Sequence, residues 1–255
     1  MKIGFFDSGM GGITVLSDAV NFLKPAEFIY YADTKNVPYG VKTKKEVKKL
    51  VFDSVDFLIS KKIDILVVAC NTATSVAIKD IRKKYDIPII GMEPAVKPAV
   101  INSSKKKRVL VTATELTLKE KKYNKLVQRI DKNHRVDSLS LGTLVDYVEK
   151  ENFDKKKILN YLKKRFKDID LNLYETVVLG CTHFIFYKDF FREFLPDHIE
   201  IIDGNIGTVR HLKDVLIEEN LYKSDIERSK IKFYSSRNNI EDEIKFEKLL
   251  VKYRS

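Results

Sequence analysis

The sequence predicts an α/β protein with two similar halves, each built on a mostly parallel sheet, and an active site in the cleft between the two domains. Three observations predict this fold. Short β-branched or aromatic runs alternate with longer amphipathic runs. The stretches VVACNTA (67–73) and VVLGCTH (177–183) both place a cysteine at the end of an apolar run. A similar spacing separates Asp7 from Cys70 and Thr114 from Cys181, which indicates pseudo-symmetric halves.

The strands are predicted from short apolar runs that Gly, Pro, Asp or Asn bound. They cover residues 3–6, 28–32, 65–69, 87–91, 108–112, 135–140, 176–179 and 200–202. Amphipathic patterns between them predict helices over residues 12–22, 44–61, 73–85, 117–129, 153–166 and 186–194. Strands that alternate with helices of this length favour parallel βαβ units, with helices on both faces of each sheet.

The junction between the halves is predicted near residues 93–107, where Pro94, Pro98 and a basic stretch suit a boundary. The residues after about 205 read as mostly helical, and pattern alone does not place them. The expected domains are residues 1–96 plus about 207–255 for the first, and residues 97–206 for the second.

Composition describes a globular protein of ordinary polarity, with 44% hydrophobic and 33% charged residues among 255. No apolar run approaches the roughly 18 residues that a membrane helix needs, so no membrane partner is expected. The N-terminal MKIGFFDSG does not resemble a signal peptide. We therefore expect a cytoplasmic protein whose two cysteines stay reduced.

The net charge of +11 raises the question of nucleic-acid binding. Its lysines are scattered through helical segments and loops, at 42–49, 105–108 and 155–157, without an interleaved aromatic patch. Solvated helix faces explain them better, so nucleic acid is not the expected partner. A non-catalytic nucleic-acid or regulatory-protein binder remains the alternative, and it predicts salt-sensitive DNA binding that survives loss of both cysteines.

Polar residues gather at the predicted carboxyl ends of the strands, which is where open α/β sheets bind ligands. They are Asp7, Ser8, Cys70, Asn71, Thr114, Cys181 and His183. If the two halves face each other, the cysteines line opposite walls of one cleft. A thiolate on one side of a planar carbanion and a thiol on the other can invert a stereocentre. Asp7 and His183 are then the candidates that manage the thiol protons, and short polar side chains nearby are candidate substrate ligands.

Simpler interpretations exist for each residue. A lone buried cysteine is usually a small core residue, and a pair can be a redox sensor. Asp7, Ser8 and Thr72 are also candidate helix caps. A zinc site is not expected, because the chain has no CxxC and only four histidines. The GMGG run lacks the spacing of a dinucleotide fingerprint and suits a tight turn instead.

Several stretches together resemble the glutamate racemases of the aspartate/glutamate racemase superfamily. They appear in family order from residue 3 to about 205: IGFFDSGMGG (3–12), ADTKNVPYG (32–40), VVACNTA (67–73), GMEP (91–94), Thr114-x-x-Thr117 and LGCTH (179–183). Departures include Ala32 and Ala113 in place of glycine, and Ile185-Phe186 in place of a proline-containing continuation. No departure removes a residue that the family uses in catalysis.

The resemblance implies a cofactor-independent interconversion of L- and D-glutamate that supplies peptidoglycan synthesis, in a homodimer. It implies that Cys70 takes the α-proton of D-glutamate and Cys181 that of L-glutamate. Asp7 is expected to assist Cys70, and His183 to assist Cys181 together with a glutamate, for which Glu149 is the better match and Glu151 the alternative. The expected substrate ligands are Ser8, Pro38, Tyr39, Gly40, Asn71, Thr72, Thr114, Thr117 and Thr182. A racemase of aspartate or another acidic amino acid is the rival, although the DSGxGG and PYG stretches favour glutamate.

Overall fold

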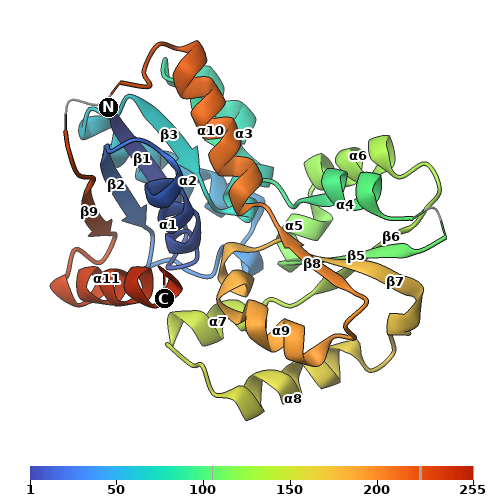
Figure 1. Cartoon of the computed structure of the whole chain (residues 1–255). Coiled ribbons are helices and arrows are strands. Elements are labelled where there is room, and N and C mark those ends of the chain that lie inside the picture. Colours follow the sequence, from blue (N-terminus) through green and yellow to red (C-terminus); the bar gives the residue numbers. More distant parts are fainter. Residues whose placement is uncertain (105, 224–225, 255) are drawn as a thin grey trace.

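A computed structural model describes residues 1–104, 106–223 and 226–254 of the chain. Its strands form two separate sheets, and every strand pairing in both of them is parallel (Figure 1). The five-stranded sheet has the order β4-β3-β1-β2-β9, and the four-stranded sheet has the order β6-β5-β7-β8. The predicted fold class of two parallel α/β halves is confirmed.

The first sheet is built from both ends of the described chain. Its strands are β1 (Lys2–Asp7), β2 (Glu27–Ala32), β3 (Ile65–Val68), β4 (Ile89–Gly91) and β9 (Lys230–Ser235). Alternate side chains point to opposite faces, as strand geometry requires. Phe5 and Phe28 belong to one core cluster, whereas Phe6 and Ile29 belong to another on the opposite face.

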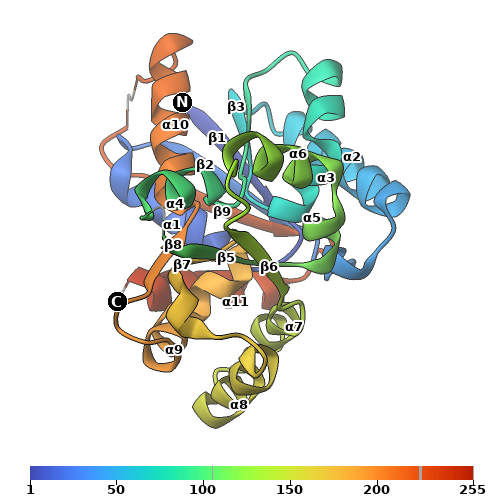
Figure 2. The same ribbon diagram turned by 90° about the vertical axis from the view of Figure 1, so that its right-hand side faces the viewer.

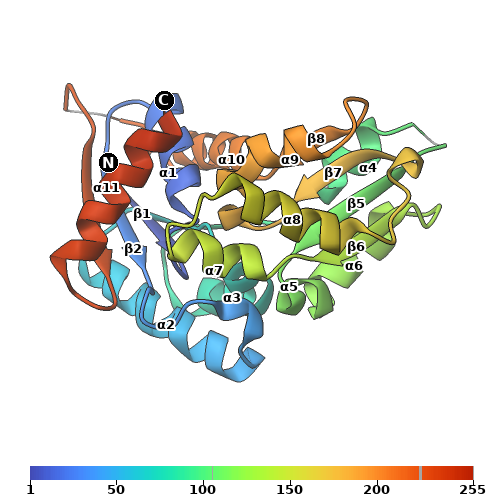
Figure 3. The same cartoon turned by 90° about the horizontal axis from the view of Figure 1, so that it is seen from below.

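Helices cover both faces of this sheet. They are α1 (Ile13–Phe22), α2 (Lys44–Ser60), α3 (Asn71–Lys84), α10 (Asn205–Glu218) and α11 (Ile240–Arg254). The core on one face includes residues of α1, α10 and α11, and the core on the other includes residues of α2 and α3. Seen from below, α11 lies beside α1 at the outer side of the first sheet (Figure 3).

The second sheet lies within one continuous segment. It contains β5 (Arg108–Ala113), β6 (Val136–Ser140), β7 (Tyr174–Leu179) and β8 (Glu200–Asp203). One face is covered by α4 (Val96–Asn102) and α6 (Lys121–Ile130), and the other by α7 (Thr143–Glu149), α8 (Lys155–Phe166) and α9 (Lys188–Phe194) (Figure 2). Short connections are α5 (Glu115–Lys119) and the 3-10 helices η1 (Tyr39–Val41), η2 (Leu171–Leu173) and η3 (Thr182–Tyr187).

All eight predicted strands are present, with ends that differ by a few residues. The prediction for the chain after residue 205 was incomplete, because β9 interrupts the helices there and pairs with β2. The predicted helix 117–129 is divided at Glu120, whose extended backbone separates α5 from α6. The helices α4 and α7 were not predicted, since each has only seven residues and gives a weak periodic signal.

The chain leaves the first sheet after β4, forms the whole second sheet, and returns through α10 to add β9. The predicted limits near residues 96 and 207 lie outside the strands of both sheets. As domain boundaries they stay a prediction. Among the helices of the described ranges, none is long and apolar enough to cross a membrane.

Candidate active site

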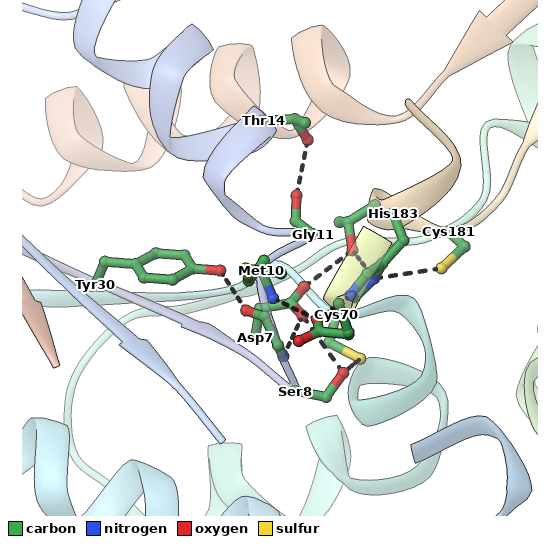
Figure 4. A network of polar contacts seen from close by, with 12 residues as sticks. Asp7, Ser8, Met10, Gly11, Thr14, Tyr30, Cys70, Cys181 and His183 are labelled. Atoms are coloured by element: carbon green, nitrogen blue, oxygen red, sulfur yellow. Dashed lines mark hydrogen bonds and ion pairs between the residues drawn. The ribbon is translucent and has the colours of Figure 1, made fainter. Parts of the chain in front are cut away.

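Asp7 and the two cysteines lie at the carboxyl ends of inner strands from both sheets. Asp7 is the last residue of β1, and Cys70 follows β3 and caps the N-terminus of α3. Cys181 follows β7 of the second sheet and precedes η3. Both cysteines are buried and unpaired. Figure 4 shows them in one polar network with Asp7, Ser8 and His183.

Burial and Asp7 keep the Cys70 thiol neutral, although hydrogen bonds from Ser8 and Ala73 oppose them. Burial raises its pKa to about 12, and the charge of Asp7 acts in the same direction. Ser8 Oγ lies 3.5 Å from Cys70 Sγ and 3.4 Å from Asp7 Oδ1, so the serine hydroxyl lies between the thiol and the carboxylate. The backbone N–H of Ala73 also donates to the sulfur, at 3.4 Å.

Cys181 faces an imidazole that a carboxylate holds. His183 Nδ1 lies 3.9 Å from Cys181 Sγ, and His183 Nε2 lies 2.7 Å from Glu149 Oε1. Burial opposes the charged form of His183, but the hydrogen bonds to Cys181 and Glu149 outweigh it and raise the pKa of His183 well above its ordinary value. His183 is therefore an imidazolium at neutral pH, with one N–H directed at each partner.

The two halves meet directly at Asp7. Thr182 Oγ1, from the second half, donates to Asp7 Oδ2 at 3.0 Å, while the Gly9 N–H donates to Asp7 Oδ1 at 2.9 Å. Burial raises the pKa of Asp7, and the positive charge of His183 partly counteracts this.

The glycines of the GMGG run (9–12) form the loop after β1, where neighbouring atoms leave no room for a β-carbon. A methyl group at Gly9 would overlap the Glu149 carboxylate, one at Gly11 would overlap Thr182 and His183, and one at Gly12 would lie 2.7 Å from Asp7 Cβ. The glycines therefore allow the second half to approach this loop. The Met10 N–H donates to Glu149 Oε1 at 2.8 Å, a contact that sequence reasoning missed because a backbone donor has no residue signature.

The structure brings Glu149, rather than Glu151, to His183. Glu149 is the last residue of α7 and accepts from both Met10 and His183. Glu151 follows with a positive φ of 51° and pairs with Lys245 at 2.9 Å. Of the two candidates that the sequence left open, Glu149 therefore lies beside His183 and Glu151 does not. The chemical role of Glu149 belongs to the proposal below.

Three expected substrate ligands form a second cluster. Thr72 Oγ1 lies 2.9 Å from Thr114 Oγ1 and 3.0 Å from Thr117 Oγ1, and the latter two are 3.0 Å apart. Thr72 belongs to α3, Thr114 caps the N-terminus of α5, and Thr117 lies within α5. The three hydroxyls therefore also join the two halves. The amide of Asn71 is buried, and neither its nitrogen nor its oxygen has a hydrogen-bond partner.

The PYG stretch closes one side of the threonine cluster. A methyl group at Gly40 would lie 2.7 Å from Thr114 Cβ, and Pro38 lines a pocket that Glu149 also lines. The ring of Tyr39 packs against Phe6, and its hydroxyl donates to Asp33 at 2.6 Å. Only the backbone of Tyr39 is therefore available for the substrate contact that the sequence predicts.

Within the described ranges, no group of three or more His, Cys, Asp and Glu side chains is arranged to hold a metal ion. The titratable groups instead form two pairs, Asp7 with Cys70 and His183 with Cys181. Each pair places one thiol beside a group that can influence its proton. The arrangement defines an α/β protein with a two-thiol site between its halves.

The chain belongs to the Asp/Glu/hydantoin racemase family, whose model matches residues 18–212. It is 54% identical to the glutamate racemase of Halothermothrix orenii over 96% of both chains. The crystal structure of Campylobacter jejuni glutamate racemase superposes with a TM-score of 0.83 and 30% identity, covering 98% of each chain. The glutamate racemase of Francisella tularensis, solved in complex with D-glutamate, superposes with a TM-score of 0.84 and 25% identity over 98% of this chain and 93% of that one.

Proposed function

We propose that this protein interconverts L- and D-glutamate without a cofactor, using one thiol on each side of the α-carbon. The observation that carries the proposal is the placement of Cys70 and Cys181 at strand ends of different sheets, around one contact between Asp7 and Thr182. The relatives named glutamate racemase support the choice of substrate, and one of them was solved with D-glutamate.

In the proposed L-to-D reaction, Cys181 acts as the thiolate and Cys70 as the thiol. Cys70 is a neutral thiol at pH 7, since its pKa is raised to about 12. His183 Nδ1 lies 3.9 Å from Cys181 Sγ, so an imidazolium faces the sulfur that acts as the base in this proposal. A thiolate opposite a thiol is the pair that a two-base inversion requires.

In the L-to-D direction, the Cys181 thiolate removes the α-proton of L-glutamate, and the electron pair of the C–H bond remains on the α-carbon. The Cys70 thiol then delivers its proton from the opposite face. The products are D-glutamate, a Cys70 thiolate and a Cys181 thiol. The reverse direction uses the same groups in exchanged roles, with Asp7 assisting Cys70 through Ser8, and Glu149 and His183 assisting Cys181.

Substrate binding requires the halves to separate. Ser8, Asn71 and the three clustered threonines, which are expected to hold glutamate, are at most 4% exposed. The three threonines satisfy one another, and Asn71 has no partner. An incoming carboxylate would exchange the bonds between threonines for bonds to itself and would supply the partner that the buried Asn71 amide lacks.

The test is incubation of the purified protein with L-glutamate in D₂O without any added cofactor. Formation of D-glutamate with deuterium at the α-carbon is expected, and Cys70→Ser or Cys181→Ser is expected to lose nearly all activity. Formation of D-glutamate only after addition of pyridoxal phosphate would contradict the cofactor-free mechanism. So would wild-type activity in the double Cys→Ala protein. A panel of acidic amino acids followed by circular dichroism separates glutamate from aspartate as substrate.

The physiological setting follows from the same reaction. We propose that the product D-glutamate supplies peptidoglycan synthesis, that the protein acts in the cytoplasm, where both thiols stay reduced, and that it works as a homodimer. Gel filtration with light scattering tests the dimer. Rescue of a D-glutamate-requiring bacterium by this chain, but not by its Cys70→Ser variant, tests the supply of D-glutamate.

A further inference from the structure

The hydroxyl of Tyr30 lies beneath the loop that carries the site and has no place in the reaction described above. Tyr30 belongs to β2, is fully buried, and donates from its hydroxyl to the Gly9 carbonyl at 2.7 Å (Figure 4). The Tyr30 side chain therefore holds the start of the Gly9–Gly12 loop.

This loop carries two N–H groups that orient the carboxylates of the site. The Gly9 N–H donates to Asp7, beside Cys70, and the Met10 N–H donates to Glu149, beside His183 and Cys181. The loop backbone therefore contacts both half-sites, which are Asp7 with Cys70 and Glu149 with His183 and Cys181. A shift of Gly9 would move both donors together, because the Gly9 carbonyl and the Met10 N–H belong to the same peptide group.

The ring of Tyr30 is supported by the last part of the chain. It packs edge-on against Phe233 of β9 at 6.0 Å and against Phe246 of α11 at 5.6 Å between centroids. Tyr30 and Phe233 are also register partners in the β2–β9 pairing. Burial, followed by the charge of Asp7, raises the pKa of Tyr30 well above its ordinary value, so the hydroxyl remains a donor at every pH of an ordinary assay.

We propose that Tyr30 is a positioning residue for the racemisation: its hydroxyl fixes the Gly9–Gly12 loop, and the loop in turn fixes Asp7 and Glu149 against their partners. The proposal rests on the proposed function. It also gives β9 and α11 a function, because these elements hold the Tyr30 ring from outside the catalytic network.

The test compares Tyr30→Phe with Tyr31→Phe. Tyr31 is the next residue of β2, is also buried, and lies in the core on the opposite face of the sheet. Each variant loses one hydroxyl. For Tyr30→Phe we expect kcat to fall about tenfold or more in both directions with KM within about twofold, because small misplacements of catalytic groups slow the chemical step. The primary isotope effect with α-deuterated glutamate should rise, since proton transfer becomes more rate-limiting.

A second measurement needs no substrate. In ¹⁵N-histidine spectra of the full chain, His183 is one of four histidines, and it is assigned by its loss in His183→Gln. Its neighbours with titratable groups are Cys181, Glu149 and Asp7. Tyr30→Phe should lower the titration midpoint of His183, because Glu149 loses a fixed orientation, whereas Tyr31→Phe should leave it unchanged.

A purely structural role for Tyr30 would lower the melting temperature but leave kcat per folded molecule, the isotope effect and the His183 midpoint as in Tyr31→Phe. That result overturns the proposal. If Tyr30→Phe does not fold, Phe246→Leu keeps the hydroxyl and loosens the ring, and the same readouts should change in the same direction or the proposal fails. If wild-type protein does not exchange the α-proton of glutamate, the proposed function fails, and the His183 titration still tests the role of Tyr30.

Discussion

His183 Nε2 lies 2.7 Å from Glu149 Oε1, and the opposite ring nitrogen lies 3.9 Å from Cys181 Sγ. The His183 ring therefore lies between the Glu149 carboxylate and the sulfur of Cys181. At Cys70, by contrast, burial and the nearby Asp7 raise the pKa of the thiol to about 12. The difference between the two half-sites is the source of the first two predictions.

Replacing Glu149 with Gln should lower kcat at neutral pH about a hundredfold, in line with the usual contribution of a positioned proton-transfer partner. The carboxylate is one of the groups that raise the pKa of His183. Without it, His183 loses its proton at lower pH, so the alkaline limb of the pH–rate profile should move to lower pH. Initial rates between pH 6 and 10 measure both changes.

The matched control for this change is Glu151→Gln. Glu151 lies two residues away and pairs with Lys245 instead of His183. Because this ion pair is largely exposed, its loss should change stability by less than about 1 kcal/mol. The Glu151→Gln variant should also retain the wild-type pH profile. Equal effects of the two substitutions on kcat would show that the assignment of Glu149 is wrong.

Cys181 should react with iodoacetamide faster than Cys70. At pH 8, a thiol with a pKa of about 12 is ionised in only about one molecule in ten thousand, and the thiolate is the nucleophile. The two residues are similarly buried, at 5% and 7% exposure, so access does not explain a difference. We expect at least about tenfold faster labelling of Cys181, measured by mass spectrometry of the peptides. Equal labelling in urea is the control, and faster labelling of Cys70 in the folded protein would refute the assignment.

Much of the fold could be predicted because its buried parallel strands are short apolar runs with clear boundaries. The run ILVV (65–68) is an example, since every residue of β3 is fully buried. The strand β9 has no such signal. Its sequence KIKFYS lies at the edge of the sheet, and the three side chains that precede Phe233 are exposed or only partly buried. Its place depends on pairing with β2, which is a tertiary contact.

The site was predictable where a residue type and a strand end coincide, as for Asp7, the two cysteines and His183. It was not predictable where orientation decides. Glu149 and Glu151 are two residues apart, so they point in different directions around the end of α7, and only the packing of α7 against the Gly9 loop shows which one meets His183. The same holds for the Tyr39 ring, whose hydroxyl is held by Asp33.

The raised pKa of Cys70 should make stability depend on pH in the alkaline range. The folded state keeps the thiol proton up to about pH 12, whereas the unfolded chain releases it near its ordinary value of about 9. The folded state therefore binds more protons than the unfolded state between these values, and the free energy of unfolding falls as pH rises by up to about 1.4 kcal/mol per pH unit.

Urea unfolding of wild type and Cys70→Ser between pH 8 and 10.5 measures this effect. All other titrating groups are shared, so the difference in unfolding free energy between the two proteins isolates Cys70. We expect that difference to be constant up to about pH 9 and then to shift in favour of Cys70→Ser. A difference that does not vary with pH would mean that the Cys70 thiol titrates normally in the folded protein.

Substitution by alanine should stabilise the fold at Gly207 and slow the reaction at Gly9. A methyl group at Gly207, in α10, meets no atom within 4 Å, so Gly207→Ala should raise the free energy of unfolding by about 0.5–1 kcal/mol through the lower entropy of the unfolded chain. A methyl group at Gly9 overlaps the Glu149 carboxylate. Gly9→Ala should therefore displace Glu149 from His183 and lower kcat about a hundredfold, as Glu149→Gln does.

The combination of the two substitutions decides the cause. If the methyl group acts by displacing Glu149, then Gly9→Ala in a Glu149→Gln background should cost much less than it does alone, because the interaction it disrupts is already absent. Steady-state kinetics of the two single variants and the double variant give this coupling directly. Additive losses would mean that Gly9→Ala acts through Asp7, to which the Gly9 N–H also donates. In that case the loss of kcat would not come from the displacement of Glu149. The loop would then matter more for Asp7 and Cys70 than for His183 and Cys181.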